Sequence, residues 1–274
     1  MISYRNIATS QHRNIAIAIL ASTIISVSPT LFAASQATPS STTSAIHLNN
    51  EITLSGGLTI SSLSNGNQTV AINNTVSNTY DTNTATNVNG MAGLTYGRVF
   101  HLKHDLAITI GPSLYYSNMD QVNGTEHPFS NAGNFDTLNY HYSADSWSLM
   151  AESKLVYEKY QWQPFITGGI GPSWNRLSSY GEVPTDSSGS ATANPSVFKN
   201  NTQAQFAYDV GFGVQRIFYR DAKHNVSYRA SLAYRYFNFG SGQLSPASIS
   251  TTGQAIKVST LDTNAILFGV SAVF

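Results

Sequence analysis

Eight short segments of this 274-residue sequence alternate between apolar and polar residues with a period of two. In the segment QFAYDVGFGVQ, Phe206, Tyr208 and Val210 share one parity. Asp209 and Gln215 have the other parity. Successive side chains of a β-strand point to opposite faces of its sheet, so this alternation predicts strands with one apolar face. The other seven segments are EITLSGGLTI, NVNGMAGLTYG, DLAITIGPSLYY, SWSLMAESKLVY, PFITGGIGPSW, VSYRASLAYRY and NAILFGVSAVF.

The connections between these segments alternate in length. Four are long and rich in Asn, Ser, Thr and Gly, at residues 61–86, 118–139, 176–201 and 238–259, whereas FHLKH, EKYQW and YRDAKH are short. Long loops at one end and tight turns at the other are typical of an outer-membrane barrel, which must close because lipid cannot pair an open sheet edge. We therefore expect an all-β fold, an eight-stranded antiparallel transmembrane β-barrel with four long extracellular loops and three short periplasmic turns.

A secreted soluble barrel of the lipocalin type is the competing interpretation. It also has eight strands, but its apolar face would point inward onto a ligand. That fold explains neither the alternation of long and short connections nor the polar, charged opposite face. The transmembrane barrel is therefore favoured.

The first 34 residues have the three-part pattern of a secretory signal peptide. Arg5 and Arg13 precede an uncharged apolar stretch, and small residues follow it. We expect cleavage between residues 33 and 37. Pro29 interrupts the apolar stretch and disfavours a membrane-spanning helix. We interpret the chain as a signal peptide (residues 1–34), a short flexible segment (residues 35–46) and a transmembrane β-barrel (residues 47–274).

The composition excludes several classes of function. Only about 10% of the residues are charged, and 14 basic residues balance 14 acidic ones, so we expect no nucleic-acid partner. The absence of cysteine excludes disulfides, thiolate metal sites and a cysteine nucleophile. His101, His104 and His224 lie in short connections, where solvated histidines are the ordinary interpretation. We therefore expect no metal and no cofactor.

Charged residues on the inward parity are the candidate functional residues of the lumen. They are Glu152, Lys154, Asp209, Arg229 and Arg235. If the sixth and seventh segments pair around YRDAKH, Asp209 falls roughly opposite Arg235. Glu152 should then lie at a similar height to Arg229. The favoured interpretation is a structural plug of ion pairs and hydrogen bonds, and the alternative is a gated polar path.

Aromatic residues collect near both ends of the predicted strands, where we expect two girdles at the membrane interfaces. The loop-end girdle is assigned Tyr115, Tyr116, Tyr142, Trp147, Trp174, Tyr208, Tyr234 and Tyr236. The turn-end girdle is assigned Phe100, Tyr157, Tyr160, Trp162, Phe218, Tyr219 and Phe274.

HYSADSW is the one pattern that resembles a catalytic site. His141 and Ser143 resemble the His-x-Ser of the outer-membrane lipid A 3-O-deacylase family. However, Ala144 stands where that family has Asn, and Glu152 has the opposite parity. We therefore expect interfacial polar residues here and no enzyme activity.

Three segments, QFAYDVGFGVQ, SLAYRYFNFG and QPFITGGIGPSWN, resemble strands of eight-stranded outer-membrane proteins of the OmpA/OmpX and opacity-protein type. The resemblance covers residues 47–274 and is specific for a barrel rather than for an activity. It implies that the last strand carries the signal read by the barrel-assembly machinery. That signal consists of Ile266, Phe268, Val270, Ala272 and Phe274.

The resemblance implies a monomeric surface protein of a Gram-negative outer membrane, surrounded by lipid and lipopolysaccharide. We expect a structural or adhesin-like role in which the extracellular loops contact host or phage ligands. The alternative is a narrow channel for small or hydrophobic molecules, similar to OmpW-type proteins. A lipid A-modifying enzyme is the minor alternative.

Overall fold

The structure is a computed structural model that describes residues 50–63, 66–83, 85–132, 137–185, 197–246 and 252–274. The expected signal peptide (residues 1–34) and flexible segment (residues 35–46) lie outside the described residues. In the described part of the chain, no helix has both the length and the apolar character needed to cross a membrane.

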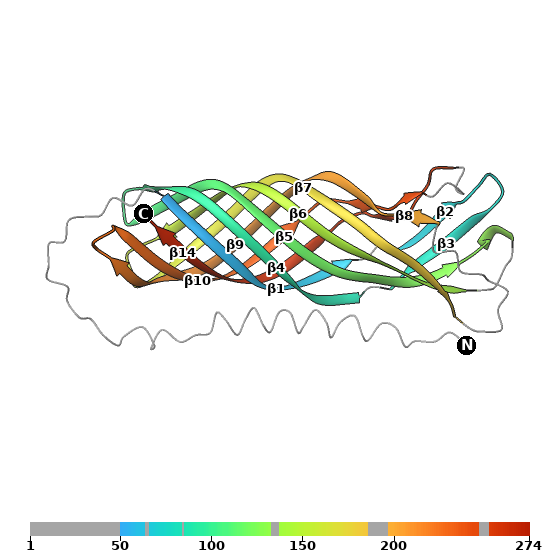
Figure 1. Ribbon diagram of the computed structural model, residues 1–274, viewed down its shortest axis with the longest axis horizontal. Coiled ribbons are helices and arrows are strands. Elements are labelled where there is room, and N and C mark those ends of the chain that lie inside the picture. Colours follow the sequence, from blue (N-terminus) through green and yellow to red (C-terminus); the bar gives the residue numbers. More distant parts are fainter. Residues whose placement is uncertain (1–49, 64–65, 84, 133–136, 186–196, 247–251) are drawn as a thin grey trace. The chain divides into compact units, whose positions relative to one another are not determined.

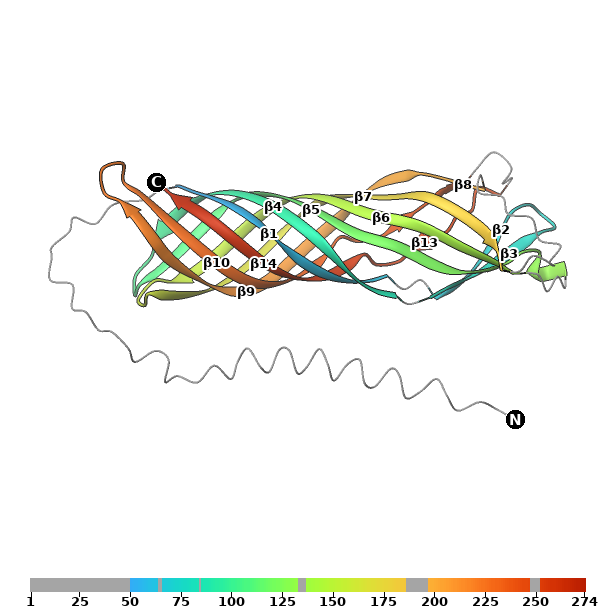
Figure 2. The ribbon, with the colours of Figure 1, turned by 60° about the horizontal axis from the view of Figure 1, so that its bottom comes forward.

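Eight long strands among the described residues form one closed antiparallel ring (Figures 1 and 2). They are β1 (Asn50–Leu63), β4 (Ala85–His101), β5 (Leu106–His127), β6 (Leu138–Tyr157), β7 (Trp162–Pro184), β9 (Asn201–Asp221), β10 (Val226–Asn238) and β14 (Asp262–Val273). Each strand pairs with the next in this order, and β14 returns to β1. The predicted all-β, eight-stranded fold is confirmed.

The ring closes where the first and last strands meet. The backbone groups of Asn50 and Phe274 exchange two hydrogen bonds, each 2.9 Å long. At Gly57, β1 and β14 approach so closely that a Cβ atom would lie 1.9 Å from the carbonyl oxygen of Ile266. Only glycine fits this contact, so Gly57 permits the close pairing that seals the barrel.

The outer face of the barrel is apolar along the section that joins the short turns. Leu54, Phe206 and Phe268 point outward there and are 66%, 64% and 65% exposed. Polar residues on the opposite parity, such as Thr59 and Gln215, are buried inside. An apolar outer band with a polar interior is the arrangement that a bilayer requires. The described residues therefore form a transmembrane barrel.

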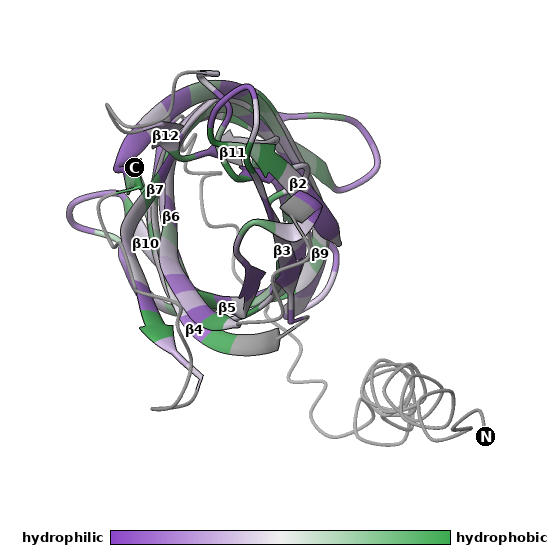
Figure 3. Cartoon of the chain, turned by 90° about the vertical axis from the view of Figure 1, so that its right-hand side faces the viewer, coloured by the Kyte–Doolittle hydropathy of each residue, from purple (hydrophilic) through white to green (hydrophobic). Residues whose placement is uncertain are grey.

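Four strands are much longer than a membrane crossing requires. β5, β6, β7 and β9 contain 22, 20, 23 and 21 residues, whereas a tilted crossing needs about ten. Their far ends continue the barrel beyond the apolar band, in a section that we call the extension. A hairpin of β2 (Asn67–Ala71) and β3 (Ser77–Thr82) joins it by pairing β3 with β5. Figure 3 looks into the ring from this end.

The extension corrects the prediction that residues 118–139 and 176–201 are loops, because most of their described residues lie in long strands. The inward face of the strands changes from polar to apolar where the barrel leaves the apolar band. Within the band, Glu152 of β6 points inward and Leu149 points outward. Beyond the band, Tyr142 of the same strand points inward and His141 points outward. Water surrounds the extension, so its apolar side chains point inward as in a soluble barrel.

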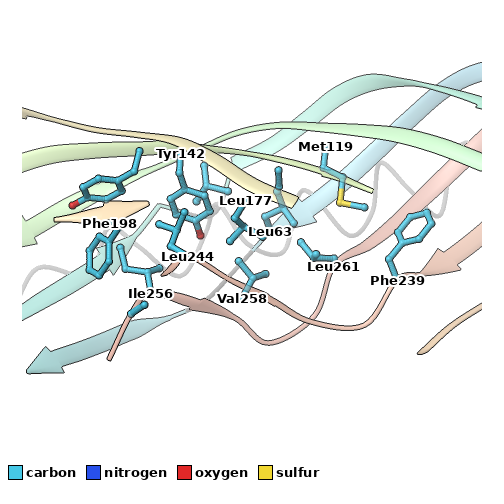
Figure 4. Close-up of a cluster of buried hydrophobic side chains, with 14 of the residues drawn as sticks. Leu63, Met119, Tyr142, Leu177, Phe198, Phe239, Leu244, Ile256, Val258 and Leu261 are labelled. Atoms are coloured by element: carbon cyan, nitrogen blue, oxygen red, sulfur yellow. The ribbon is translucent and has the colours of Figure 1, made fainter. Parts of the chain in front are cut away.

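The chain between β10 and β14 turns back into the lumen of the extension. Two short strand pairs hold it there, β11 (Gly242–Gln243) with β13 (Lys257–Val258) and β12 (Ser245–Pro246) with β8 (Phe198–Lys199). Its buried side chains pack against strand residues that include Met119, Tyr142 and Leu177 (Figure 4). We call this group the apolar plug: Phe239, Leu244, Ile256, Val258 and Leu261, each fully buried.

Candidate functional site in the barrel lumen

Arg235 is the centre of a buried polar network inside the membrane section. Its Nη1 lies 3.1 Å from Oε1 of Glu152, and its Nη2 donates a hydrogen bond to Oδ1 of Asp209. All three side chains are at most 8% exposed. The structure thus brings together Asp209 and Arg235, as the hairpin estimate predicted, and adds Glu152. We call these three residues the arginine triad.

Aromatic and hydroxyl groups complete the surroundings of the triad. The guanidinium carbon of Arg235 lies 4.9 Å from the ring centroids of both Tyr115 and Phe237. The Tyr115 hydroxyl donates a 2.6 Å hydrogen bond to Oε2 of Glu152, and Thr167 donates one of 2.9 Å to Oε1. Both carboxylate oxygens of Glu152 therefore have partners, which offsets the free-energy cost of burying its charge.

Lys154 forms a second ion pair in the lumen. Its Nζ lies 2.5 Å from Oε1 of Glu51 and also donates a 3.2 Å hydrogen bond to Gln215. Thr109 donates a 2.9 Å hydrogen bond to the other carboxylate oxygen of Glu51. Lys154 follows Glu152 by two residues on β6, so this ion pair lies closer to the short-turn end of the barrel than the arginine triad does.

Arg229 pairs with a residue other than Glu152, although the sequence predicted that these two lie at a similar height in the barrel. Its Nη2 lies 3.3 Å from Oε1 of Glu158, and the other oxygen of Glu158 lies 3.3 Å from Nδ1 of His101. Strands of a barrel tilt against its axis, so residues on the non-adjacent strands β6 and β10 cannot be aligned by counting from a turn. Glu152 consequently meets Arg235 instead.

Three residues of the network were not among the predicted lumen residues: Glu51, Tyr115 and Glu158. Glu51 has the inward parity of its strand but stands at the very start of the first segment. Tyr115 was assigned to the loop-end girdle, yet its ring is 1% exposed and points into the lumen. Tyr142, assigned to the same girdle, is likewise buried. Glu158 lies in a short turn, where no alternation indicates its direction. Parity alone would have identified Glu51 and Tyr115.

A small cavity separates the two inner ion-pair groups. Its volume is about 60 Å³, and its lining includes Glu51, Lys154, Tyr115 and Arg235. A space of this size has room for a few water molecules. An eight-stranded barrel is just wide enough for side chains to fill its interior, and the cavity agrees with that limit.

The polar and apolar fillings of the lumen are continuous. Arg235 lies against the ring of Phe237, and that ring stacks on Phe239 of the apolar plug with centroids 5.7 Å apart. Ser173 and Asn175 donate hydrogen bonds of 2.6 and 2.7 Å to the carbonyl oxygen of Phe239. These bonds attach the plug to the wall of the barrel at β7.

Two buried acids lie farther out, in the extension. Oε1 of Glu126 accepts hydrogen bonds of 2.6 Å from Asn78 and 3.0 Å from Tyr80. Tyr180 donates a 2.6 Å hydrogen bond to Glu182. Burial, followed by the neighbouring charge of Glu182, raises the pKa of Glu126 from 4.5 to about 8. Burial among these groups therefore favours the neutral form of the Glu126 carboxyl.

The residues of the catalytic-looking pattern lie on the outer side of β6. His141, Ser143 and Asp145 are each half-buried. The pairing of β6 with β7 shifts register between His141 and Ser143, so the chain is irregular within the motif. Asp145 pairs in register with Arg176 of β7. In the described part of the chain, no group of three or more His, Asp or Glu side chains has the geometry of a metal site.

Comparison with known proteins finds similarity at the level of solved structures only. No family model matches, and no curated protein matches. Neisserial surface protein A is 9% identical with a TM-score of 0.42, over 81% of this chain and 97% of that one. Ail, the attachment invasion locus protein of Yersinia pestis, is 11% identical with a TM-score of 0.36, over 83% and 100%.

The outer membrane protein OprG from Pseudomonas aeruginosa is similar to the same degree. It is 10% identical with a TM-score of 0.36, over 82% of this chain and 97% of that one. These scores are too low to carry an inference about function. The barrel assignment rests on the strand pairing and the apolar outer band of this chain.

Proposed function

We propose that the protein is a non-conducting barrel of a bacterial outer membrane that acts through its extension. The filled lumen supports this proposal most directly. The Lys154–Glu51 pair, the arginine triad and the apolar plug occupy successive parts of the interior. With the lumen occupied, the surface of the extension is the part of the molecule best placed to meet a partner.

Local hydrogen bonds hold the turn at the tip of the β2–β3 hairpin. The turn between β2 and β3 is fixed by Asn73, whose side-chain oxygen accepts hydrogen bonds from the backbone N–H groups of Thr75 and Val76 at 2.9 and 2.8 Å. β3 continues the wall of the barrel through its pairing with β5. Loops on a rigid scaffold commonly carry binding functions. The role we propose is adhesin-like or structural, for a monomer whose partners are host or phage surfaces and lipopolysaccharide.

Accessibility of the two barrel ends tests this proposal. An epitope inserted after Asn74, in the β2–β3 turn, is expected to bind antibody on intact cells. The same epitope inserted after Lys223, in the β9–β10 turn, is expected to bind only after the outer membrane is permeabilised. The reverse result would contradict the proposed orientation, and no staining of intact cells at either site would contradict the proposed location.

Attachment of cells tests the adhesive role separately. Cells that express the protein are expected to attach to cultured epithelial cells more than vector-only cells do, and antibody against the Asn74 epitope should remove the difference. Equal attachment of expressing and vector-only cells would contradict an adhesive role and leave the structural role. The proposal assigns the chain no catalytic activity.

A narrow channel similar to OmpW-type proteins is the alternative function. The cavity beside Lys154 and Arg235 is the observation in its favour. Conduction would require both the arginine triad and the apolar plug to move aside, because both fill the lumen.

A further inference from the structure

Three cations lie over aromatic rings on the outer face of the barrel, all at its short-turn end. Arg216 lies 5.3 Å from the ring centroid of Trp162, Lys159 lies 5.9 Å from that of Tyr160, and Arg98 lies 5.7 Å from that of Phe100. All six side chains are exposed. Aromatic rings at the end of an apolar band mark the level of the lipid headgroups.

Two of these pairs lie at the start of β7, within four consecutive residues and the strand paired with them. Trp162 on β7 and Arg216 on β9 are directly paired across neighbouring strands. Lys159 and Tyr160 lie in the turn that leads into β7. We call these four residues the cation patch. Arg98 is separate, because β1, β14 and β10 lie between β4 and β9 in the ring.

A β-bulge widens the aromatic border of the patch. The pairing of β9 with β10 shifts register at Tyr228, so Phe218 is the extra residue. Phe218 and Tyr219 are consecutive, yet they are 60% and 56% exposed. A regular strand would have turned one of them inward, and the bulge places both at the outer face. This wall therefore has more interfacial aromatic surface than alternation alone would provide.

The charges of the patch are not neutralised by the protein. Within the described residues, neither Lys159 nor Arg216 has an ion-pair partner. The nearby acid Glu158 is engaged by Arg229 and His101. At the same end, Asp221 is engaged by His224. Two positive charges thus face the lipid boundary without a counter-charge, although the whole chain has no net charge.

We propose that the cation patch binds the phosphate of an anionic phospholipid in the membrane leaflet at the short-turn end, which is the periplasmic leaflet in the proposed orientation. The patch is continuous with the apolar band. The acyl chains of a lipid can therefore lie along the band while the lipid headgroup contacts Arg216 and Lys159. A guanidinium and an ammonium group suit a phosphate diester, which carries a full negative charge. This inference goes beyond the proposed function, and it depends on the transmembrane fold rather than on a surface ligand.

Fluorescence quenching by brominated lipids tests the proposal, because Trp162 is part of the patch. The chain contains three tryptophans, so Trp147→Phe with Trp174→Phe leaves Trp162 as the single reporter. The full barrel is reconstituted in phosphatidylcholine vesicles that contain a fixed fraction of brominated phosphatidylglycerol or brominated phosphatidylcholine. We expect the quenching at Trp162 to indicate a preference for phosphatidylglycerol of roughly five-fold. Raising the salt concentration should reduce that preference.

Matched variants localise the effect. Lys159→Gln with Arg216→Gln should bring the preference close to one, whereas Lys223→Gln, which removes a cation from the neighbouring turn, should leave it unchanged. A barrel in which only Trp174 remains should report no comparable preference. Equal quenching by the two lipids at Trp162, or the same loss of preference in Lys223→Gln, would overturn the proposal. Because equal quenching in the otherwise native chain is sufficient, the test does not depend on folding of the double variant.

Discussion

Replacement of Arg235 by methionine is expected to lower the melting temperature of the reconstituted barrel by about 10 °C, because it leaves Glu152 and Asp209 buried without their shared cation. Removing one partner of a buried ion pair typically costs about 3–5 kcal/mol of unfolding free energy. Methionine keeps much of the volume of arginine, so lost packing contributes little to the change. The measurement is the shift from folded to unfolded mobility on gels after heating in detergent.

A compensated variant separates charge from packing. Glu152→Gln and Asp209→Asn, added to Arg235→Met, remove both uncompensated charges and should recover most of the lost stability. If the single and compensated variants melt at the same temperature, or if Arg235→Met melts like the wild type, the triad does not stabilise the lumen. Measurements of this kind also test the sequence-based interpretation of the lumen charges as a structural plug.

Deletion of Phe274, or its replacement by aspartate, is expected to remove most of the assembled, heat-modifiable barrel from cells. Phe274 is 46% exposed on the outer face, and its backbone closes the ring through the two hydrogen bonds to Asn50. If the chain carries the assembly signal that its resemblance to eight-stranded outer-membrane proteins implies, Phe274 is the last position of that signal. The measurement is the amount of folded barrel in outer-membrane fractions.

Two controls show whether Phe274 acts as a signal or as a structural contact. Purified Phe274→Asp should refold in detergent, because an acid near the membrane interface costs only about 0–1 kcal/mol. Phe218→Asp, at a similarly exposed position of the same end, should assemble normally in cells. Normal cellular assembly of Phe274→Asp would contradict the terminal signal, and failure to refold in detergent would indicate a structural role instead.

The membrane section was predictable from the sequence because one rule governs it. Lipid outside and polar side chains inside fix the parity of each strand, so Leu54, Phe206 and Phe268 could be placed on the outer face. Asp209 and Arg235 could be related because a short turn joins their neighbouring strands. Glu152 could not be assigned its partner, since strand tilt sets the relative heights of strands that are not neighbours.

The extension was not predicted because the rule of apolar side chains outward and polar side chains inward is reversed beyond the membrane. There water lies outside, so Met119 and Tyr142 point inward and their polar neighbours point outward. In residues rich in Asn, Ser, Thr and Gly, this weaker alternation predicts loops rather than strands. The apolar plug was unpredictable for a different reason. Ile256 and Val258 are isolated apolar residues in a polar stretch, and only the folded barrel shows the core that they enter.

The closed lumen is the central claim, and single-channel recording in planar bilayers tests it most directly. Purified wild-type barrel, shown to be folded by its heat-modifiable mobility, is expected to produce no conductance steps. The physical reason is that the arginine triad and the apolar plug fill the interior in series. Reproducible conductance steps from the folded wild-type barrel would contradict the account and favour the narrow-channel alternative.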